Sequence, residues 1–163
     1  DLHISFQEMN GVDVSPDMVA RTIDEYPVLS VAASLAEGVT TFAGVGELRN
    51  KESDRISTMT QELRKLGVRI EESEDGMKIW GSKRLCGTRL KGYGDHRVVM
   101  ALAVAGLSSS GGVEIEDSAS ANISFPGFFD GNESKQLPHR DRKFPHFFFT
   151  LCRNPTKYLD GLP

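Results

Sequence analysis

The sequence predicts an α/β fold in which one unit of strands and helices occurs about twice. Two stretches without charged residues, 28–36 and 98–107, have the composition of buried helices, and a β-branched strand follows each of them. Asp24 and Asp95 lie just before these helices and are 71 positions apart. A shared period of this length indicates two copies of a unit with the order strand, helix, strand, helix, strand, strand.

The first elements follow from apolar patterning and from turn residues. Alternation over residues 2–6 predicts a strand. Pro27 suits a first helical position, and the apolar stretch 28–36 predicts a buried helix that ends before Gly38. Residues 39–42 are β-branched and aromatic, which predicts a strand directly after the helix.

An amphipathic helix and a hairpin come next. Four apolar residues recur at helical spacing on an otherwise polar segment that ends at Gly67: Ile56, Met59, Leu63 and Leu66. Residues 68–72 and 77–80 then flank Asp75-Gly76, a pair typical of a tight turn between antiparallel strands. We therefore expect one surface helix followed by two paired strands.

The second half repeats this order. The apolar helix at 98–107 leads through a Ser/Gly stretch to a strand at 113–116. Residues 124–126 would open one more helix, but the tail supplies no body for it. Lys51 and Asn122 are also 71 positions apart, so the polar loops after the two strands correspond. Corresponding loops are expected to face the same end of the structure.

The chain divides into two parts of different composition. Residues 1–130 have 13 Lys and Arg against 20 Asp and Glu, whereas residues 131–163 have six against three. The second part also holds four of the seven prolines and four of the nine phenylalanines, which leaves no helical or strand periodicity. We predict a folded domain over 1–130 and a disordered tail over 131–163, with docking on a partner through Phe147–Phe149 as the alternative.

Charge and composition argue against several classes of protein. The net charge of −4 without a basic stripe argues against nucleic-acid binding. The longest apolar run, 98–107, is about half the ~20 residues of a membrane helix, so no membrane contact is expected. Cys86 and Cys152 make no disulfide framework and fit a reducing compartment. The predicted location is the cytoplasm.

The predicted helix starts at 23–27, 51–55 and 94–97 are rich in charged residues. Their free N–H groups attract anions, cations strengthen that attraction, and carboxylates can move protons. The candidate residues are Lys51, Arg55, Arg97, Asp24 and Glu52. Acidic residues in a first helical turn are also ordinary caps, and a charged run is also an ordinary solvated helix start. Three such turns at corresponding places of a repeat favour a phosphate or carboxylate site.

Five segments resemble one known family in order and spacing. They are residues 23–29, 47–56, 62–67, 95–97 and 124–129. Together they resemble the 5-enolpyruvylshikimate-3-phosphate synthases, most closely the bacterial, glyphosate-tolerant branch. The resemblance covers about residues 10–130; from Gly131 onward the chain resembles nothing in the family, as an out-of-frame reading of the last stretch would produce.

The resemblance implies the enolpyruvyl transferase fold, two domains joined by a hinge, each with three βαβαββ units and with the site between them. This chain holds about two units, so residues 1–130 would be part of the C-terminal domain, and the missing N-terminal domain would be needed to complete the cleft. The family transfers the enolpyruvyl group of phosphoenolpyruvate to the 5-hydroxyl of shikimate 3-phosphate and releases phosphate. It uses no metal and no organic cofactor. We expect the isolated chain to be inactive.

The resemblance also implies roles for the candidate residues. Asp24 matches the proton acceptor beside the shikimate hydroxyls, and Glu52 matches its acid/base partner. Lys51 matches a lysine at the hydroxyl and the developing charge. Arg55 and Arg97 match arginines that bind phosphoenolpyruvate.

Some positions leave alternatives open. His96 is either a structural hydrogen-bonding residue or a proton relay. Asn50 stands where the family usually has an apolar residue, and Ile123 stands where one branch has a lysine near phosphoenolpyruvate.

Two other functions remain for the chain as a whole. It could be a UDP-N-acetylglucosamine enolpyruvyl transferase of the same fold, or a non-catalytic remnant or interaction piece.

Overall fold

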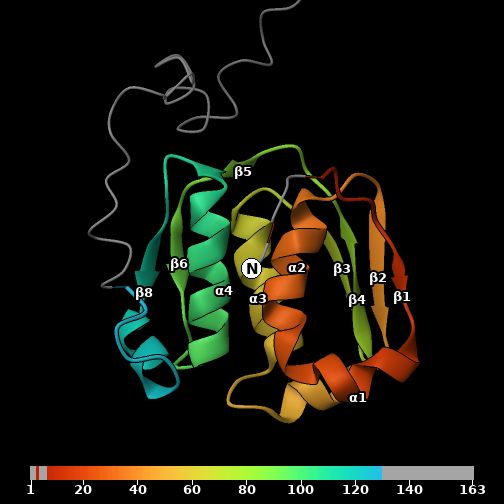
Figure 1. Cartoon of the computed structure of the whole chain (residues 1–163), viewed down its shortest axis with the longest axis horizontal. Coiled ribbons are helices and arrows are strands. Elements are labelled where there is room, and N and C mark those ends of the chain that lie inside the picture. The colour runs from red at the N-terminus through yellow and green to blue at the C-terminus, as the bar shows by residue number, and fades with distance from the viewer. Residues whose placement is uncertain (1–2, 4–6, 130–163) are drawn as a thin grey trace, which may run out of the picture.

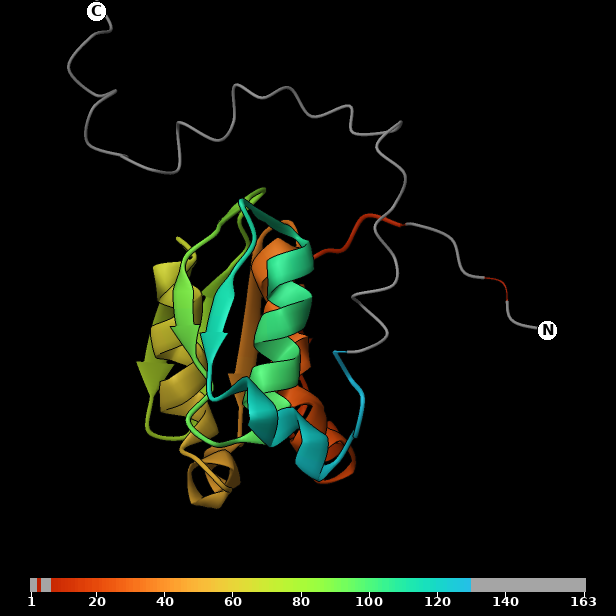
Figure 2. The same cartoon turned by 90° about the vertical axis from the view of Figure 1, so that its left-hand side faces the viewer.

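The computed structural model describes residue 3 and residues 7–129 of the chain. Three helices run side by side, with a four-stranded sheet on one flank and two shorter pairs of strands on the other (Figures 1 and 2). This arrangement confirms the predicted α/β class.

The four-stranded sheet has the order β1-β2-β4-β3. Its strands are β1 (Asp13–Val14), β2 (Val39–Ala43), β3 (Arg69–Ser73) and β4 (Gly76–Trp80). β1 pairs parallel with β2, while β4 pairs antiparallel with both β2 and β3. The hairpin of β3 and β4 turns at Asp75, as the sequence predicts. The carbonyl oxygen of Phe42 lies where a Cβ at Gly76 would be, so β2 and β4 can approach only because that residue is glycine.

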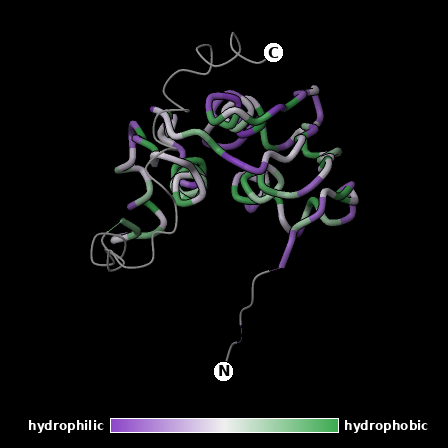
Figure 3. Tube along the Cα trace, turned by 90° about the horizontal axis from the view of Figure 1, so that it is seen from above, coloured by the Kyte–Doolittle hydropathy of each residue, from purple (hydrophilic) through white to green (hydrophobic). Residues whose placement is uncertain are grey.

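The three helices begin close to the predicted positions. They are α2 (Tyr26–Leu35), α3 (Arg55–Lys65) and α4 (His96–Leu107). Seen from above, all three are nearly end-on (Figure 3). The four apolar residues of the amphipathic stripe on and just after α3 are at most 1% exposed, so this face forms the centre of the core. After α2 and α3 the chain turns through Gly38 and Gly67, whose φ angles are +90° and +89°.

The second unit repeats the first half of the pattern with shorter strands. β5 (Leu85–Cys86) pairs parallel with β7 (Ser109–Ser110), and β6 (Arg89–Lys91) pairs parallel with β8 (Glu114–Glu116). In both units a buried helix connects two parallel strands, and a 3₁₀ helix follows: η3 (Gly46–Asn50) and η4 (Ser118–Ile123). The predicted repeat is therefore confirmed, with one complete βαβαββ unit and part of a second.

Short helical turns, which the sequence does not predict, precede α2. These are η1 (Pro16–Met18), α1 (Val19–Thr22) and η2 (Ile23–Glu25). Asp24 lies in the 3₁₀ turn η2, directly before the start of α2. The prediction that Asp24 lies at the start of this helix is therefore confirmed.

The prediction that residues 124–126 open a helix is wrong. The 3₁₀ helix η4 ends at Ile123, and residues 124–129 form turns and bends. Gly127 has a φ of +79°, a left-handed conformation that interrupts an α-helix directly after Pro126. The predicted strand at residues 2–6, except for residue 3, and the predicted tail at 131–163 lie outside the described residues. Within the described part of the chain, no helix is both long and apolar enough to cross a membrane.

Candidate functional site

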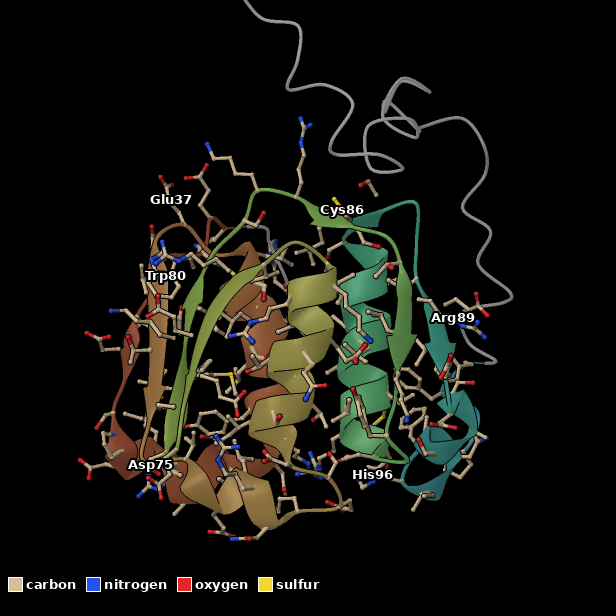
Figure 4. All side chains as sticks on the ribbon, turned by 180° about the vertical axis from the view of Figure 1, so that it is seen from behind. Glu37, Asp75, Trp80, Cys86, Arg89 and His96 are labelled. Carbon is tan, nitrogen blue, oxygen red and sulfur yellow. The ribbon has the colours of Figure 1, made fainter. Side chains whose placement is uncertain are left out.

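All three long helices begin at the same end of the molecule (Figure 1). Figure 4 shows His96 at this end, at the foot of α4, together with Asp75 of the hairpin turn, whereas Glu37 and Cys86 lie at the opposite end. The repeat explains the common end, because α2 and α4 run in the same direction from corresponding loops. The charged segments that the sequence identified are thus brought together.

Arg55, the first residue of α3, is the centre of the cluster, and its side chain is 1% exposed. Its Nε donates to Asp95 Oδ2 at 2.9 Å, its Nη1 to Asp24 Oδ1 at 3.0 Å and its Nη2 to Glu52 Oε2 at 2.6 Å. Asp24 and Asp95, which correspond in the repeat, therefore bind the same arginine. Burial lowers the pKa of Arg55, but these carboxylates outweigh it and raise the pKa above its ordinary value.

Asp95 both caps α4 and binds Arg55, and its side chain is completely buried. Its Oδ1 caps α4 by accepting from the backbone N–H of Arg97 at 2.9 Å, and its Oδ2 accepts from Ser53 Oγ at 3.0 Å as well as from Arg55. Burial alone would raise the pKa of Asp95. The hydrogen bonds and charge of Arg55, with those of Ser53 and the Arg97 N–H, outweigh burial and lower the pKa.

Arg97 joins the cluster from the first turn of α4. Its Nη1 donates to the carbonyl oxygen of Asp24 at 3.0 Å and to Glu25 Oε1 at 3.2 Å, and its Nη2 lies 3.7 Å from Asp24 Oδ2. The side chain is 31% exposed, in contrast to that of Arg55. Arg97 is therefore the arginine of this cluster that faces solvent.

A shallow pocket of about 180 Å³ lies beside Arg97. Its polar side consists of Asp24, Glu25 and Arg97. The rest is apolar and comes from the first turns of α2, the outer face of α4 and the turn after η4: Pro27, Val28, Met100, Ala101, Val104 and Phe128. The pocket places a charged rim next to an apolar wall.

Lys51 stays outside the arginine cluster in the described part of the chain. Its ammonium group pairs with Glu47 of η3 at 2.9 Å. The loop from Lys51 to Asp54 is held by Arg49, which donates to Asp54 Oδ2 at 2.7 Å and to the carbonyl oxygen of Ser73 at 2.6 Å. The structure thus unites four of the five candidate residues and leaves Lys51 at the edge, one residue from Glu52.

The side chain of His96 makes no hydrogen bond with any residue between 7 and 129. It is half-buried at the start of α4, so neither of its two predicted roles is tested. The sequence missed Asp95 and Glu25 as members of the cluster. The sequence held one sign that Asp95 belongs to the cluster, which is its correspondence with Asp24 in the repeat. Because Asp95 is also expected to cap α4, its bond to Arg55 was not predicted.

The ordinary interpretation of acidic residues at helix starts holds for only some of them. Asp54 and Asp95 cap α3 and α4 through their side chains. Asp24 and Glu52 cap no helix; their carboxylates bind Arg55 and are 47% and 50% exposed. Two half-exposed carboxylates beside a buried cation can accept and release protons while that cation holds them in place.

Stability should depend on the charge of Asp95 in acid. Its folded-state pKa lies below the unfolded value of about 3.9, so its contribution is complete above that pH and is lost as the pH falls through the folded pKa. We expect the difference in unfolding free energy between wild type and Asp95→Asn to be constant from about pH 7 to 5 and to shrink below about pH 4. Urea unfolding at several pH values measures it, and a difference that stays constant to about pH 2 would contradict the ion pair.

The chain is similar to proteins of known function. The family model described as EPSP synthase (3-phosphoshikimate 1-carboxyvinyltransferase) matches residues 2–131. The 3-phosphoshikimate 1-carboxyvinyltransferase of Thermodesulfovibrio yellowstonii is 46% identical over 125 residues, which are 77% of this chain and 29% of that protein. That of Bacillus cereus strain G9842 is 43% identical over 130 residues, 80% of this chain and 30% of the relative.

A solved structure agrees with these relatives. An EPSP synthase of Acinetobacter baumannii superposes with a TM-score of 0.73 and 36% identity, over 77% of this chain and 30% of the other. The chain therefore spans about 30% of the length of the proteins that it matches.

Proposed function

Since the chain belongs to the EPSP synthase family, we propose that its helix-start cluster forms one wall of a site for enolpyruvyl transfer. The substrates are phosphoenolpyruvate and shikimate 3-phosphate, and phosphate is released. The observation that carries the proposal is the convergence of Asp24, Glu52, Arg55 and Arg97 from three helix starts.

The chemistry needs two groups that exchange protons. When the acceptor hydroxyl adds to phosphoenolpyruvate, the hydroxyl loses a proton and the methylene carbon gains one; elimination of phosphate reverses the change at carbon. Asp24 and Glu52 are about half exposed, as is Glu25, but of these three only Asp24 and Glu52 also bind Arg55. We assign Asp24 to the shikimate hydroxyl and Glu52 to the acid/base steps.

Both substrates are anions and require cations. Arg97 is partly exposed and borders the pocket, so it can receive the carboxylate or phosphate of phosphoenolpyruvate directly. Arg55 is already bound by three carboxylates, so an anion that binds it displaces Asp24 or Glu52. Lys51 lies at the edge of the cluster and can approach the acceptor hydroxyl by leaving Glu47.

The balance of charge supports a site with a second wall. Asp24, Glu25, Glu52 and Asp95 carry four negative charges against the two positive charges of Arg55 and Arg97. Such a cluster repels anions unless other cations join it. We propose that the part of the relatives that this chain does not match, which would include an N-terminal domain, supplies those cations.

Titration with phosphoenolpyruvate tests the proposal on the chain itself. We expect weak binding, in the millimolar range or above, with NMR shifts at the amides of Arg55, Arg97 and their neighbours, because one helix start with one exposed arginine holds an anion poorly. Arg97→Ala should abolish these shifts. Arg89→Ala is the control, since Arg89 is exposed and pairs with Glu116 away from the cluster. Equal shifts in both variants would exclude Arg97 as the anion-binding residue.

A further inference from the structure

The turn before α4 has an unusual backbone. Tyr93 has a φ of +56°, a left-handed conformation that a bulky side chain rarely adopts. Such residues persist where the surrounding contacts enforce them. Tyr93 lies two residues before Asp95, which binds Arg55 and caps the helix that carries Arg97. The conformation of this turn therefore decides where both groups of the cluster lie.

Glu62 of α3 binds this turn through hydrogen bonds. Its side chain is completely buried, and its carboxylate accepts from the Tyr93 hydroxyl at 2.8 Å and from the backbone N–H of Lys91 at 3.0 Å. Lys65, one turn later on α3, donates to it at 2.8 Å. A buried carboxylate is costly unless it is paired in this way. Glu62 thus fixes the residues on both sides of Gly92.

Further hydrogen bonds connect the 92–95 turn with the cluster. The N–H of Gly92 donates to the carbonyl oxygen of Glu116 on β8, and the N–H of Asp95 donates to the carbonyl oxygen of Gly92, both at 3.0 Å. Asp95 then reaches Arg55 and the first N–H groups of α4. Each link is a direct hydrogen bond.

We propose that Glu62 and Tyr93 are positioning residues, which lock the 92–95 turn so that Asp95 and Arg97 meet Arg55 and Asp24. Among the described residues, neither Glu62 nor Tyr93 makes a hydrogen bond or ion pair with Asp24, Glu52, Arg55 or Arg97. The significance for catalysis rests on the proposed function, but the positioning itself does not.

Tyr93 remains a hydrogen-bond donor over the whole neutral range. Burial, together with the hydrogen bond and charge of Glu62, raises the pKa of Tyr93 to about 12. Removal of the charge of Glu62 should bring that pKa back toward its ordinary value. The titration of this phenol therefore reports directly on the hydrogen bond between Tyr93 and Glu62.

The test uses the whole chain without ligand, so failure of phosphoenolpyruvate binding does not affect it. Tyr93→Phe removes the hydroxyl and Glu62→Gln removes the charge with little change of size. Glu71→Gln is the matched control, because Glu71 makes the same charge change at a 61% exposed position on β3. NMR measures hydrogen exchange at the Arg97 and Val98 amides and at Arg55 Nε–H. The amides of Thr41 on β2 and of Val45, just after β2, are the references away from the turn.

We expect exchange about tenfold faster at Arg97, Val98 and Arg55 Nε–H in Tyr93→Phe and Glu62→Gln, with Thr41 and Val45 unchanged. The phenol of Tyr93 should titrate below its wild-type pKa in Glu62→Gln. Unchanged exchange at Arg97 would overturn the proposal. Equal acceleration at Thr41 and Val45 would also overturn it, because it would show only a general structural role. If Glu62→Gln does not fold, Tyr93→Phe decides between these outcomes.

Discussion

Arg55→Met is expected to lower the free energy of unfolding by about 3–5 kcal/mol, since it leaves a buried charge without its partner. Asp95 is completely buried and Arg55 is 1% exposed, so water cannot replace the lost cation. A domain of this size is stable by about 5–15 kcal/mol, so the loss is a large part of the total. Urea unfolding followed by circular dichroism measures the effect as a lower midpoint.

Two further variants separate this ion pair from a general effect of losing an arginine. Arg89→Met removes a 66% exposed arginine that pairs with Glu114 and Glu116, and it should cost less than about 1 kcal/mol. Asp95→Asn combined with Arg55→Met should recover part of the loss, because the double variant no longer buries an unpaired charge. If Arg55→Met costs no more than Arg89→Met, the buried cluster does not form.

Glu52→Gln is expected to have the largest effect on catalysis. The measurement uses a hybrid protein in which this chain replaces the matching segment of the Thermodesulfovibrio yellowstonii relative, so that both walls of the proposed site are present. Glutamine keeps the size of Glu52 and still accepts from Arg55, but it cannot carry a proton at neutral pH. Loss of a general acid/base group lowers kcat by about 10²–10⁴.

Glu71→Gln in the same hybrid is the control for this effect. It removes one negative charge at an exposed position of β3, and kcat should change less than about twofold. A Glu52→Gln hybrid that turns over as fast as the Glu71→Gln hybrid would exclude Glu52 from the proton-transfer steps.

The long elements of the fold are predictable from the sequence, and the short ones are not. α3 shows its apolar stripe at helical spacing, and the β3–β4 hairpin shows its Asp75-Gly76 turn. β5 and β7 have two residues each and no pattern of their own. They exist because their backbones pair with each other once α4 connects them, which is a tertiary effect.

The composition of the site is also predictable, but its internal pairing is not. The 71-residue period brings the helix starts together, and the structure confirms this for Asp24, Glu52, Arg55 and Arg97. The sequence does not reveal that Arg55 is buried under three carboxylates or that Lys51 pairs with Glu47. Those partners depend on side-chain directions at the ends of three different helices. Roles in binding and catalysis stay predictions.

We propose that this chain supplies one wall of an enolpyruvyl transfer site and that this wall is functional. Phosphate release by the purified hybrid, with phosphoenolpyruvate and shikimate 3-phosphate as substrates, tests it most directly. We expect turnover within about tenfold of that of the unaltered relative, because the segment that replaces the original one is 46% identical to it. We also expect no phosphate release by the chain alone. A hybrid that unfolds cooperatively, and so is folded, yet releases phosphate no faster than the chain alone would contradict the claim.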